Sequence, residues 1–488
     1  MKKNIANSEL NNLVSTFEYD RSKLKPRIAH LGFGAFHRAH QGLITDRVAR
    51  CSESDWGYCE INLIGGEQLI SDLQFQDNLY AVCETGATNT EVKVIGSVCK
   101  SMHPAFDGID AVLEQLADPE IAIVSLTITE KGYCIEPGSG RLDKSNKFIA
   151  EDIANPSKPI SALGYIVEAL RLRKERGVAP FSVMSCDNIP ENGHLAKRAV
   201  LDLAEVISPE LAKWIGDKVT FPCTMVDRIV PAATPESLQA LSELLGVEDP
   251  CGITCEPFLQ WVIEDNFVSG RPDWNLGGAE FVEDVVPYEE MKLRMLNGSH
   301  SFLAYLGYLG GYKHISDTMT NPDYKDAAFR MMMDNQAPTL NMPEGTDLKK
   351  YAELLIERFV NPSLKHQTWQ IAMDGSQKLP QRMLESIRYH LNNGTDFSFL
   401  ALGVAGWMRY VGGVDDGGAS IDVRDPMVDA FKSVYECNST NESVMKELLS
   451  LEGIFGSDLI ENQTFTTEVL KALDKITADG CRISVASL

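Results

Sequence analysis

Apolar and polar residues alternate in short blocks along the first third of the chain, and the blocks predict strands separated by helices. Four apolar runs have the length and composition of buried strands: 27–33, 58–64, 121–128 and 181–185. The run 121–128 (IAIVSLTI) is rich in β-branched residues, which is typical of a central parallel strand. Helical periodicity covers 36–50 and 161–177. This alternation predicts the α/β class, with a Rossmann-type doubly wound sheet.

The pattern changes near residue 287. Beyond it, helical periodicity dominates, and the loops contain proline and glycine. Seven segments follow this pattern: 288–305, 324–336, 348–359, 380–391, 399–410, 425–435 and 466–478. A chain of 488 residues exceeds what one core usually holds. We therefore predict two domains, a Rossmann-type domain over 1–285 and a mostly α-helical C-terminal domain over 286–488.

Charge and composition narrow the possible partners and the compartment. The net charge of −24 argues against nucleic-acid or acidic-membrane binding, because both need a basic surface. No apolar run approaches the roughly 20 residues that span a bilayer, and residues 1–20 lack the apolar core of a signal peptide. The 11 cysteines are odd in number and have no repeating spacing, and the pair Cys251 and Cys255 lacks a second pair of zinc ligands. We expect a cytoplasmic protein with reduced thiols and no metal.

A glycine-rich turn follows the first predicted strand and opens a helix. Gly32 allows a tight turn, and Gly34 lets the backbone approach a pyrophosphate. The helix that follows offers free N–H groups and the positive end of its dipole, so Phe36, His37 and Arg38 at its start are candidate cofactor-binding residues. His37 stands where the usual third glycine would be. The position between strand and helix favours dinucleotide binding over a purely structural turn.

Glu67 is the candidate residue for the selectivity between NAD and NADP. An acidic residue after the second strand commonly binds the adenine ribose and favours NAD. Glu67 lies in this region, and no arginine immediately follows it to bind a 2′-phosphate. A solvated loop glutamate is the alternative interpretation. We expect NAD as the cofactor.

A candidate acid/base group lies at the start of the helical domain. On an α-helix, Asn297 and His300 would share a face, and Lys292 would lie about 80° from His300. Lysine can exchange a proton with a carbonyl oxygen if burial lowers its pKa toward neutrality, while Asn297 and His300 hold that oxygen. A solvated lysine and a structural histidine are the ordinary alternatives. Tyr288 and Lys292 also match the Tyr-x-x-x-Lys pair of short-chain dehydrogenases, which are much shorter chains.

Six motifs occur in a fixed order along the chain: 32–41 (GFGAFHRAHQ), 124–130 (VSLTITE), 185–188 (SCDN), 225–229 (MVDRI), 292–300 (KLRMLNGSH) and 374–378 (DGSQK). In this combination the chain resembles the polyol-specific long-chain dehydrogenases, or mannitol dehydrogenase family, over essentially its whole length. The resemblance implies an NAD-binding N-terminal domain, a substrate-binding and catalytic C-terminal domain, and an active site in the cleft between them. It also implies a metal-independent mechanism.

The family's functional residues carry over to matching positions of this chain. The resemblance implies that Lys292 is the general acid/base, with Asn297 and His300 binding the oxyanion. It implies substrate contacts from Asn188, Asp227 and Lys378, and a proton path lined by Glu289. For Asp227, a buried ion pair with Arg228 is the alternative interpretation.

Within the family, the chain is most similar to members that reduce D-fructuronate to D-mannonate with NADH. Mannitol 2-dehydrogenases usually have an arginine shortly before the Asp-Gly-Ser stretch, whereas this chain has Gln370. A uronate needs a cation for its carboxylate, and the sequence offers four: Arg38, Arg294, Lys378 and Arg382. The alternatives are a mannitol or arabinitol dehydrogenase, a tagaturonate reductase and a non-catalytic NAD(H) sensor. We expect a small sugar acid or polyol as the ligand, and a monomer or small homo-oligomer.

Overall fold

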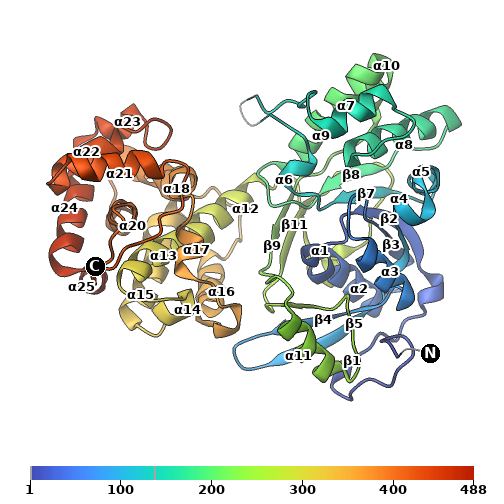
Figure 1. Ribbon diagram of the computed structural model, residues 1–488, viewed down its shortest axis with the longest axis horizontal. Coiled ribbons are helices and arrows are strands. Elements are labelled where there is room, and N and C mark those ends of the chain that lie inside the picture. The colour runs from blue at the N-terminus through green and yellow to red at the C-terminus, as the bar shows by residue number, and fades with distance from the viewer. Residues whose placement is uncertain (1–2, 137–138) are drawn as a thin grey trace. The chain divides into compact units, whose positions relative to one another are not determined.

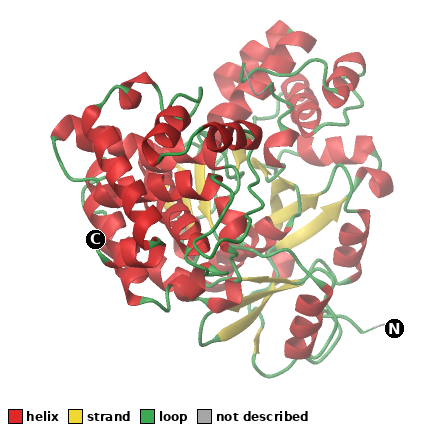
Figure 2. Ribbon diagram, turned by 60° about the vertical axis from the view of Figure 1, so that its left-hand side comes forward, coloured by secondary structure: helices red, strands yellow, loops and turns green. Residues whose placement is uncertain are grey.

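The computed structural model describes residues 3–136 and 139–488 and divides into two compact units (Figure 1). The first unit is Met1–Val286 and the second is Pro287–Leu488. The strands occur in the first unit, and the second unit, which is described in full, consists of helices and loops (Figure 2). Among the described helices, none combines the length and apolar character needed to cross a bilayer. The predicted α/β class is confirmed.

The first unit is built on a five-stranded parallel sheet with the strand order β6-β3-β2-β7-β8. Its strands are β2 (Lys25–Leu31), β3 (Trp56–Ile61), β6 (Val98–Met102), β7 (Ile123–Leu126) and β8 (Ser182–Ser185). The four runs predicted as strands therefore correspond to β2, β3, β7 and β8. Each run extends one to three residues beyond the observed strand at one or both ends, because apolar residues also line the adjoining turns. The strands β2 and β3 also begin two residues before the predicted runs.

Two further sheets complete the first unit. One has the order β1-β5-β4-β10 and comprises β1 (Val14–Ser15), β4 (Tyr80–Thr85), β5 (Thr90–Ile95) and β10 (Ile253–Cys255). The other has the order β12-β11-β9 and comprises β9 (Thr224–Asp227), β11 (Gln260–Glu264) and β12 (Glu280–Val282). Helices connect the strands: α1 (Ala35–Ala39), α2 (Gln41–Cys51), α3 (Glu67–Phe75), α4 (Pro104–Asp107), α5 (Ile109–Ala117), α6 (Thr129–Gly132), α7 (Lys147–Ala154), α8 (Ala162–Arg176), α9 (Asn192–Ile207), α10 (Pro209–Lys218) and α11 (Pro235–Leu245).

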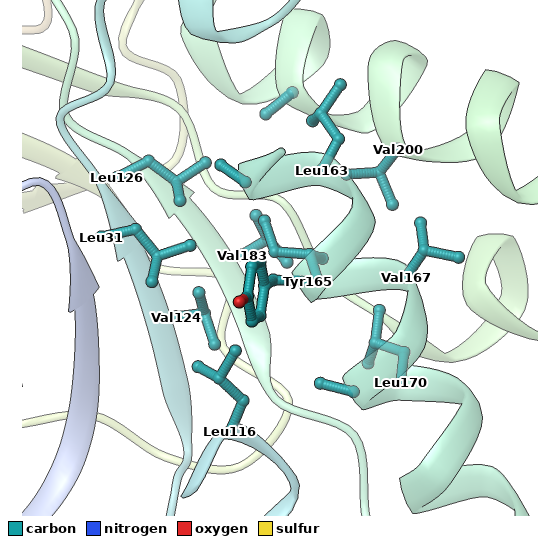
Figure 3. Close-up of a cluster of buried hydrophobic side chains, with 14 of the residues drawn as sticks. Leu31, Leu116, Val124, Leu126, Leu163, Tyr165, Val167, Leu170, Val183 and Val200 are labelled. Atoms are coloured by element: carbon teal, nitrogen blue, oxygen red, sulfur yellow. The ribbon is translucent and has the colours of Figure 1, made fainter. Parts of the chain in front are cut away.

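The period of two along each strand assigns side chains to the two faces of the parallel sheet. On one face, Leu31, Val124 and Val183 pack against α5, α8 and α9 (Figure 3). On the other face, Ile28 and Ile123 pack against α2 and the three-stranded sheet. Both faces are covered, which is why the strands read as continuous apolar runs rather than alternating ones.

The helix predicted over 36–50 is wrong as a single element. The chain forms α1 and α2, and the break lies at His40, which has φ −122° and ψ −90°. The helix predicted over 161–177 is confirmed as α8, with the Ser161 side chain capping its start and Gly177 ending it at φ +66°.

The second unit is a packed array of helices. They are α12 (Val286–Met291), α13 (Ser299–Leu309), α14 (Ile315–Thr318), α15 (Pro322–Arg330), α16 (Leu348–Val360), α17 (Thr368–Ala372), α18 (Gly375–Leu379), α19 (Glu385–Asn393), α20 (Ser398–Val411), α21 (Val428–Cys437), α22 (Asn441–Leu449), α23 (Ser457–Ile460), α24 (Gln463–Asp479) and α25 (Cys481–Ala486). The central helix is α20, which is buried along most of its length and packs against α13 and α24.

Three predicted α-helices of this unit contain π-helical turns instead of continuous α-helix. They are η3 (Lys292–Gly298), η4 (Met331–Gln336) and η7 (Pro380–Leu384). The segment η3 contacts both η4 and η7. A π-helical turn is rare and is often found at functional sites.

Candidate active site

The glycine-rich turn joins β2 to α1, and its two glycines are required for different reasons. Gly32 has φ +110°, and a Cβ atom there would lie 2.3 Å from the carbonyl oxygen of Thr127, so no other residue fits. Gly34 has ordinary extended geometry, and a Cβ there would meet only the Gly32 oxygen, at 3.7 Å. The space in front of Gly34 is therefore open, as close approach of a pyrophosphate requires.

Polar side chains from neighbouring strands hold the turn in place. Asn62, directly after β3, accepts a hydrogen bond from the Phe33 N–H at 2.8 Å. Thr127, directly after β7, donates its hydroxyl to the Gly32 oxygen at 2.7 Å. The sequence analysis missed both residues, because each lies within a run predicted as strand, 58–64 for Asn62 and 121–128 for Thr127. Gly34 caps α1 without a side-chain hydrogen bond, so the first N–H groups of the helix remain available to an anion.

A buried polar cluster lies directly beneath this turn. His30 in β2 is paired in register with Glu60 in β3 and with Ser125 in β7, so the three residues share one face of the sheet. The His37 ring stacks on the His30 ring with centroids 3.4 Å apart, and its Nε2 lies 2.8 Å from Oε1 of Glu60. His30 in turn donates from Nε2 to the Gly32 oxygen at 3.0 Å. The cluster links the sheet to the turn.

Burial sets the protonation of this cluster. It lowers the pKa of His30 and of His37 to about 3, and it raises the pKa of Glu60 to about 8. All three groups are therefore neutral at neutral pH, and the Glu60 hydroxyl donates to His37. The ligand atoms of the three side chains lie within 4.8 Å of one another, close enough to share a metal ion. The imidazole nitrogens of both histidines, however, are already engaged in hydrogen bonds.

The structure gives the predicted cofactor-binding side chains different surroundings. His37 is fully buried in the cluster, and the Arg38 guanidinium donates to the carbonyl oxygens of Gly34 and Cys251. Both side chains therefore support the turn from within, and the Arg38 backbone N–H also donates to the Gly34 oxygen, at 3.2 Å. Phe36 is half-buried and stacks on His40. Glu67 is exposed at the first position of α3, with its Oε1 4.0 Å from Nε2 of His103.

The two substrate-binding candidates of the first unit follow strand ends. Asn188 is exposed just after β8, and Asp227 is buried at the end of β9. The side chain of Asn192 joins the two segments, since its Nδ2 donates to the oxygen of Asp187 at 2.9 Å and to that of Thr224 at 2.8 Å. Asn192 thus fixes the spacing between the segments that carry Asn188 and Asp227.

Arg228 pairs with a different carboxylate from the one considered in the sequence analysis. Its guanidinium forms a buried ion pair with Glu84 and donates to the Glu256 carbonyl oxygen, with the Nε contact at 2.9 Å. The ion pair therefore joins β4 to the segment after β9.

Lys292 begins the π-helical turn η3 and is buried, with 8% of its surface exposed. The α-helical geometry assumed for this segment is wrong, because Lys292–Gly298 form a π-helical turn. On an α-helix, Lys292 and Asn297 would lie about 140° apart. Hydrogen bonds in a π-helix run from residue i to i+5, which stacks residues five apart. The π turn therefore brings Lys292 and Asn297 onto one face. His300 follows in the first turn of α13.

His300 lies among aromatic rings and positive charges of the second unit. Its ring centroid is 4.6 Å from that of Phe359 and 5.6 Å from that of His366. Burial, followed by the nearby His366, Arg358 and Arg382, holds the pKa of His300 well below its usual value. His300 is therefore a neutral imidazole at neutral pH, suited to hydrogen bonding with an oxygen.

Lys378 lies at the end of α18 and donates to the Met373 carbonyl oxygen at 2.6 Å. Burial and the neighbouring Arg382 lower the pKa of Lys378. Lys378, Arg382 and His300 thus occupy one electrostatic neighbourhood of the second unit. Glu289 lies on α12, three residues before Lys292.

Comparison with known proteins gives consistent relatives for both units. Residues 26–276 match the mannitol dehydrogenase Rossmann domain, and residues 284–477 match the mannitol dehydrogenase C-terminal domain. D-mannonate oxidoreductase of Escherichia coli K12 is 60% identical over 97% of this chain and 98% of its own.

Two solved structures are also similar. Substrate-free D-sorbitol dehydrogenase has a TM-score of 0.94 at 33% identity, covering 99% of this chain and 100% of its own. Pseudomonas fluorescens mannitol 2-dehydrogenase, in a ternary complex with NAD and D-mannitol, has a TM-score of 0.78 at 37% identity, covering 98% and 97%.

Proposed function

Since the chain belongs to the mannitol dehydrogenase family, we propose that it catalyses the reversible NADH-dependent reduction of D-fructuronate to D-mannonate. The family and its relatives make it an NAD-dependent dehydrogenase of a polyol or sugar acid. The observation that carries the choice of a sugar acid is the 60% identity to D-mannonate oxidoreductase over nearly the full length of both chains. Gln370, in place of the arginine usual in mannitol 2-dehydrogenases, supports the same choice.

The residues of the first unit fit NAD. The turn at Gly32 and Gly34 leaves open space where the pyrophosphate would lie, and the start of α1 offers the N–H groups of Phe36 and His37. The Arg38 N–H donates to the Gly34 oxygen at 3.2 Å, so we assign Arg38 a supporting role in cofactor binding. The exposed Glu67 carboxylate is available to a ribose hydroxyl. We assign cofactor binding to residues 1–285 and catalysis to residues 286–488. NADH, when bound, supplies the hydride.

The second unit supplies the proton. Lys292 protonates the ketone oxygen as hydride reaches the carbon, and in the reverse direction it removes the hydroxyl proton. Asn297 and the neutral His300 donate hydrogen bonds to the same oxygen and stabilise its developing negative charge. Glu289, on the preceding turn, passes protons between solvent and Lys292, toward Lys292 during ketone reduction and toward solvent during alcohol oxidation. This mechanism needs no metal ion.

The remaining hydroxyl groups of the open-chain substrate require polar partners. We assign this role to Asn188 and Asp227 in the first unit and to Lys378 in the second. Buried groups that hydrogen-bond a hydroxyl discriminate strongly against a substrate that lacks it, because they would be left unpaired.

The test is a substrate panel of uronates, ketoses and polyols assayed with NAD(H) and NADP(H). The proposal predicts that kcat/KM for D-fructuronate with NADH far exceeds the values for D-tagaturonate and D-fructose. Dominant activity with D-fructose, D-mannitol or D-arabinitol would move the chain to the polyol dehydrogenases. Binding of NADH without turnover of any panel member would favour a sensor.

A further inference from the structure

Arg382, in η7, uses only part of its hydrogen-bonding capacity. Its Nη1 donates to Oγ of Ser301 at 3.0 Å and to the carbonyl oxygen of Asn297 at 3.3 Å. Within residues 3–136 and 139–488, Nε and Nη2 make no hydrogen bond to the protein. A guanidinium carries five N–H groups, and this one is half-buried, so its Nε–Nη2 edge is left for a ligand.

Arg382 also lacks an acidic partner in the described part of the chain. Other arginines of the second unit have one: Arg294 lies 3.4 Å from Glu290, and Arg388 lies 2.6 Å from Asp458. Withdrawing a cation from water is costly unless a counter-charge compensates it. An anionic ligand would provide that compensation.

The backbone around Arg382 is fixed by the three π-helical turns. Gln336, at the end of η4, donates from Nε2 to the Arg382 carbonyl oxygen at 2.9 Å. Gly298, at the end of η3, lies so close that a Cβ there would be 2.9 Å from both the Arg382 oxygen and Gln336 Nε2. The Arg382 guanidinium itself contacts the backbone oxygen of Asn297, whose side chain is a proposed partner of the reacting oxygen.

The other three cations considered for the carboxylate are already engaged. Arg38 donates to the oxygens of Gly34 and Cys251, and Arg294 donates to the Thr339 oxygen at 2.6 Å and pairs with Glu290. Lys378 donates to the Met373 oxygen and, as a point charge, cannot form a bidentate fork.

We propose that Arg382 binds the substrate carboxylate through its Nε–Nη2 edge and thereby selects a sugar acid over a neutral ketose or polyol. This inference rests on the proposed function and adds the specificity-determining residue to it. Two parallel N–H···O bonds between guanidinium and carboxylate give both energy and geometric selectivity. The reacting oxygen would lie toward Asn297, and the carboxylate toward Arg382.

The experiment measures kcat/KM for D-fructuronate and for D-fructose in the wild type, Arg382→Gln, Arg382→Lys and the matched control Arg294→Gln. We expect the fructuronate-to-fructose ratio to fall by about 10²-fold or more in Arg382→Gln. Arg382→Lys should recover part of that loss, because it keeps the charge but not the fork. The ratio should stay within about threefold of wild type in Arg294→Gln, whose guanidinium already has an acidic partner.

Calorimetric titration of NADH-loaded enzyme with D-mannonate and with D-mannitol gives a readout independent of turnover, because NADH cannot accept hydride from either compound. The wild type should bind D-mannonate more tightly than D-mannitol, and Arg382→Gln should bind the two with similar affinity. A wild type that prefers D-fructuronate while Arg382→Gln keeps the same ratio would overturn this inference and leave the proposed function standing. A wild type without that preference would overturn both. If Arg382→Gln does not fold, Arg382→Lys with an unchanged ratio and unchanged D-mannonate affinity is the overturning result.

Discussion

Nε2 of His37 lies 2.8 Å from Oε1 of Glu60, and both side chains are completely buried beneath the glycine-rich turn. A charged pair at this depth would need further partners, yet Oε2 of Glu60 has none among the described residues. A neutral glutamic acid that donates to a neutral imidazole removes this difficulty. It agrees with the direction in which burial moves the pKa of each group.

This arrangement predicts how Glu60→Gln changes the pH dependence of stability. The folded-state pKa of Glu60 is raised to about 8 from 4.5, so folding takes up a proton between these values and stability falls as pH rises through that window. Glutamine cannot ionise and can still donate to His37. In the wild type, the free energy of unfolding should therefore fall by up to about 1.4 kcal/mol per pH unit across this window, and in Glu60→Gln this fall should be absent. Urea unfolding of wild type and variant between pH 4 and pH 9 measures the difference.

The stability of both proteins at acidic pH provides the control for this experiment. Burial lowers the pKa of His30 and His37 to about 3 from 6.5, so the unfolded state binds more protons in that range. Stability should therefore fall in both proteins as pH drops from 6.5 toward 3. Parallel curves above pH 5 would mean that Glu60 is ionised in the fold, contrary to the neutral pair.

The two glycines of the turn should respond differently to alanine. Gly32→Ala places a Cβ 2.3 Å from the Thr127 oxygen at φ +110°, so we expect a loss of about 3 kcal/mol or more and weak NADH binding. Gly34→Ala meets nothing closer than 3.7 Å, so stability should change by less than about 0.5 kcal/mol. NADH affinity should nevertheless fall about tenfold or more, because the methyl group fills the space for the pyrophosphate. Thermal unfolding and NADH fluorescence titration separate the two effects; full affinity in Gly34→Ala would place the cofactor elsewhere.

Much of the fold could be predicted because strand and helix periods are local properties of the sequence. The apolar run 121–128 predicted β7, and the helical periodicity of 161–177 predicted α8. The break at His40 could not be predicted, because it depends on His40 contacting the Gln260 oxygen, 220 residues away. Register across strands is equally non-local, so the grouping of His30, Glu60 and Ser125 was not visible before the sheet was known.

The predicted catalytic residues show the same limit. The segment 292–300 was interpreted with α-helical geometry, which places Lys292 about 80° from His300, whereas residues 292–298 form a π turn that stacks Lys292 on Asn297. The π turns meet around Gly298, Gln336 and Arg382, which come from three separate segments. No local pattern distinguishes such a turn from the α-helix that surrounds it. The roles of Lys292, Asn297 and His300 remain predictions.

The role of Lys292 can be separated from that of Tyr288 by two single substitutions. Lys292→Ala should lower kcat by about 10²- to 10⁴-fold, the usual contribution of a general acid/base. Its NADH affinity should be unchanged, because the proposed cofactor residues lie in the other unit. Tyr288→Phe should keep turnover, because the Tyr-x-x-x-Lys match is coincidental in this interpretation. Single-turnover NADH oxidation measures the chemical step; full turnover in Lys292→Ala together with loss in Tyr288→Phe would reverse the assignment.

Gly298 allows a test of whether the π-helical turns must stay in close contact. A Cβ at this position would lie 2.9 Å from both the backbone oxygen of Arg382 and Nε2 of Gln336, and the former belongs to a backbone that cannot move alone. Gly298→Ala should therefore cost about 1–3 kcal/mol, as overpacking usually does, and should lower kcat by displacing Asn297 next to it. Gly417→Ala is the matched control, because its nearest neighbour is Oδ1 of Asp415 at 3.4 Å in an exposed loop, and we expect a change below about 0.5 kcal/mol. Urea unfolding and steady-state kinetics of the two variants give the comparison. Equal stability and equal kcat in both would show that η3 tolerates separation from η4 and η7, and that the close contact is not needed for the site.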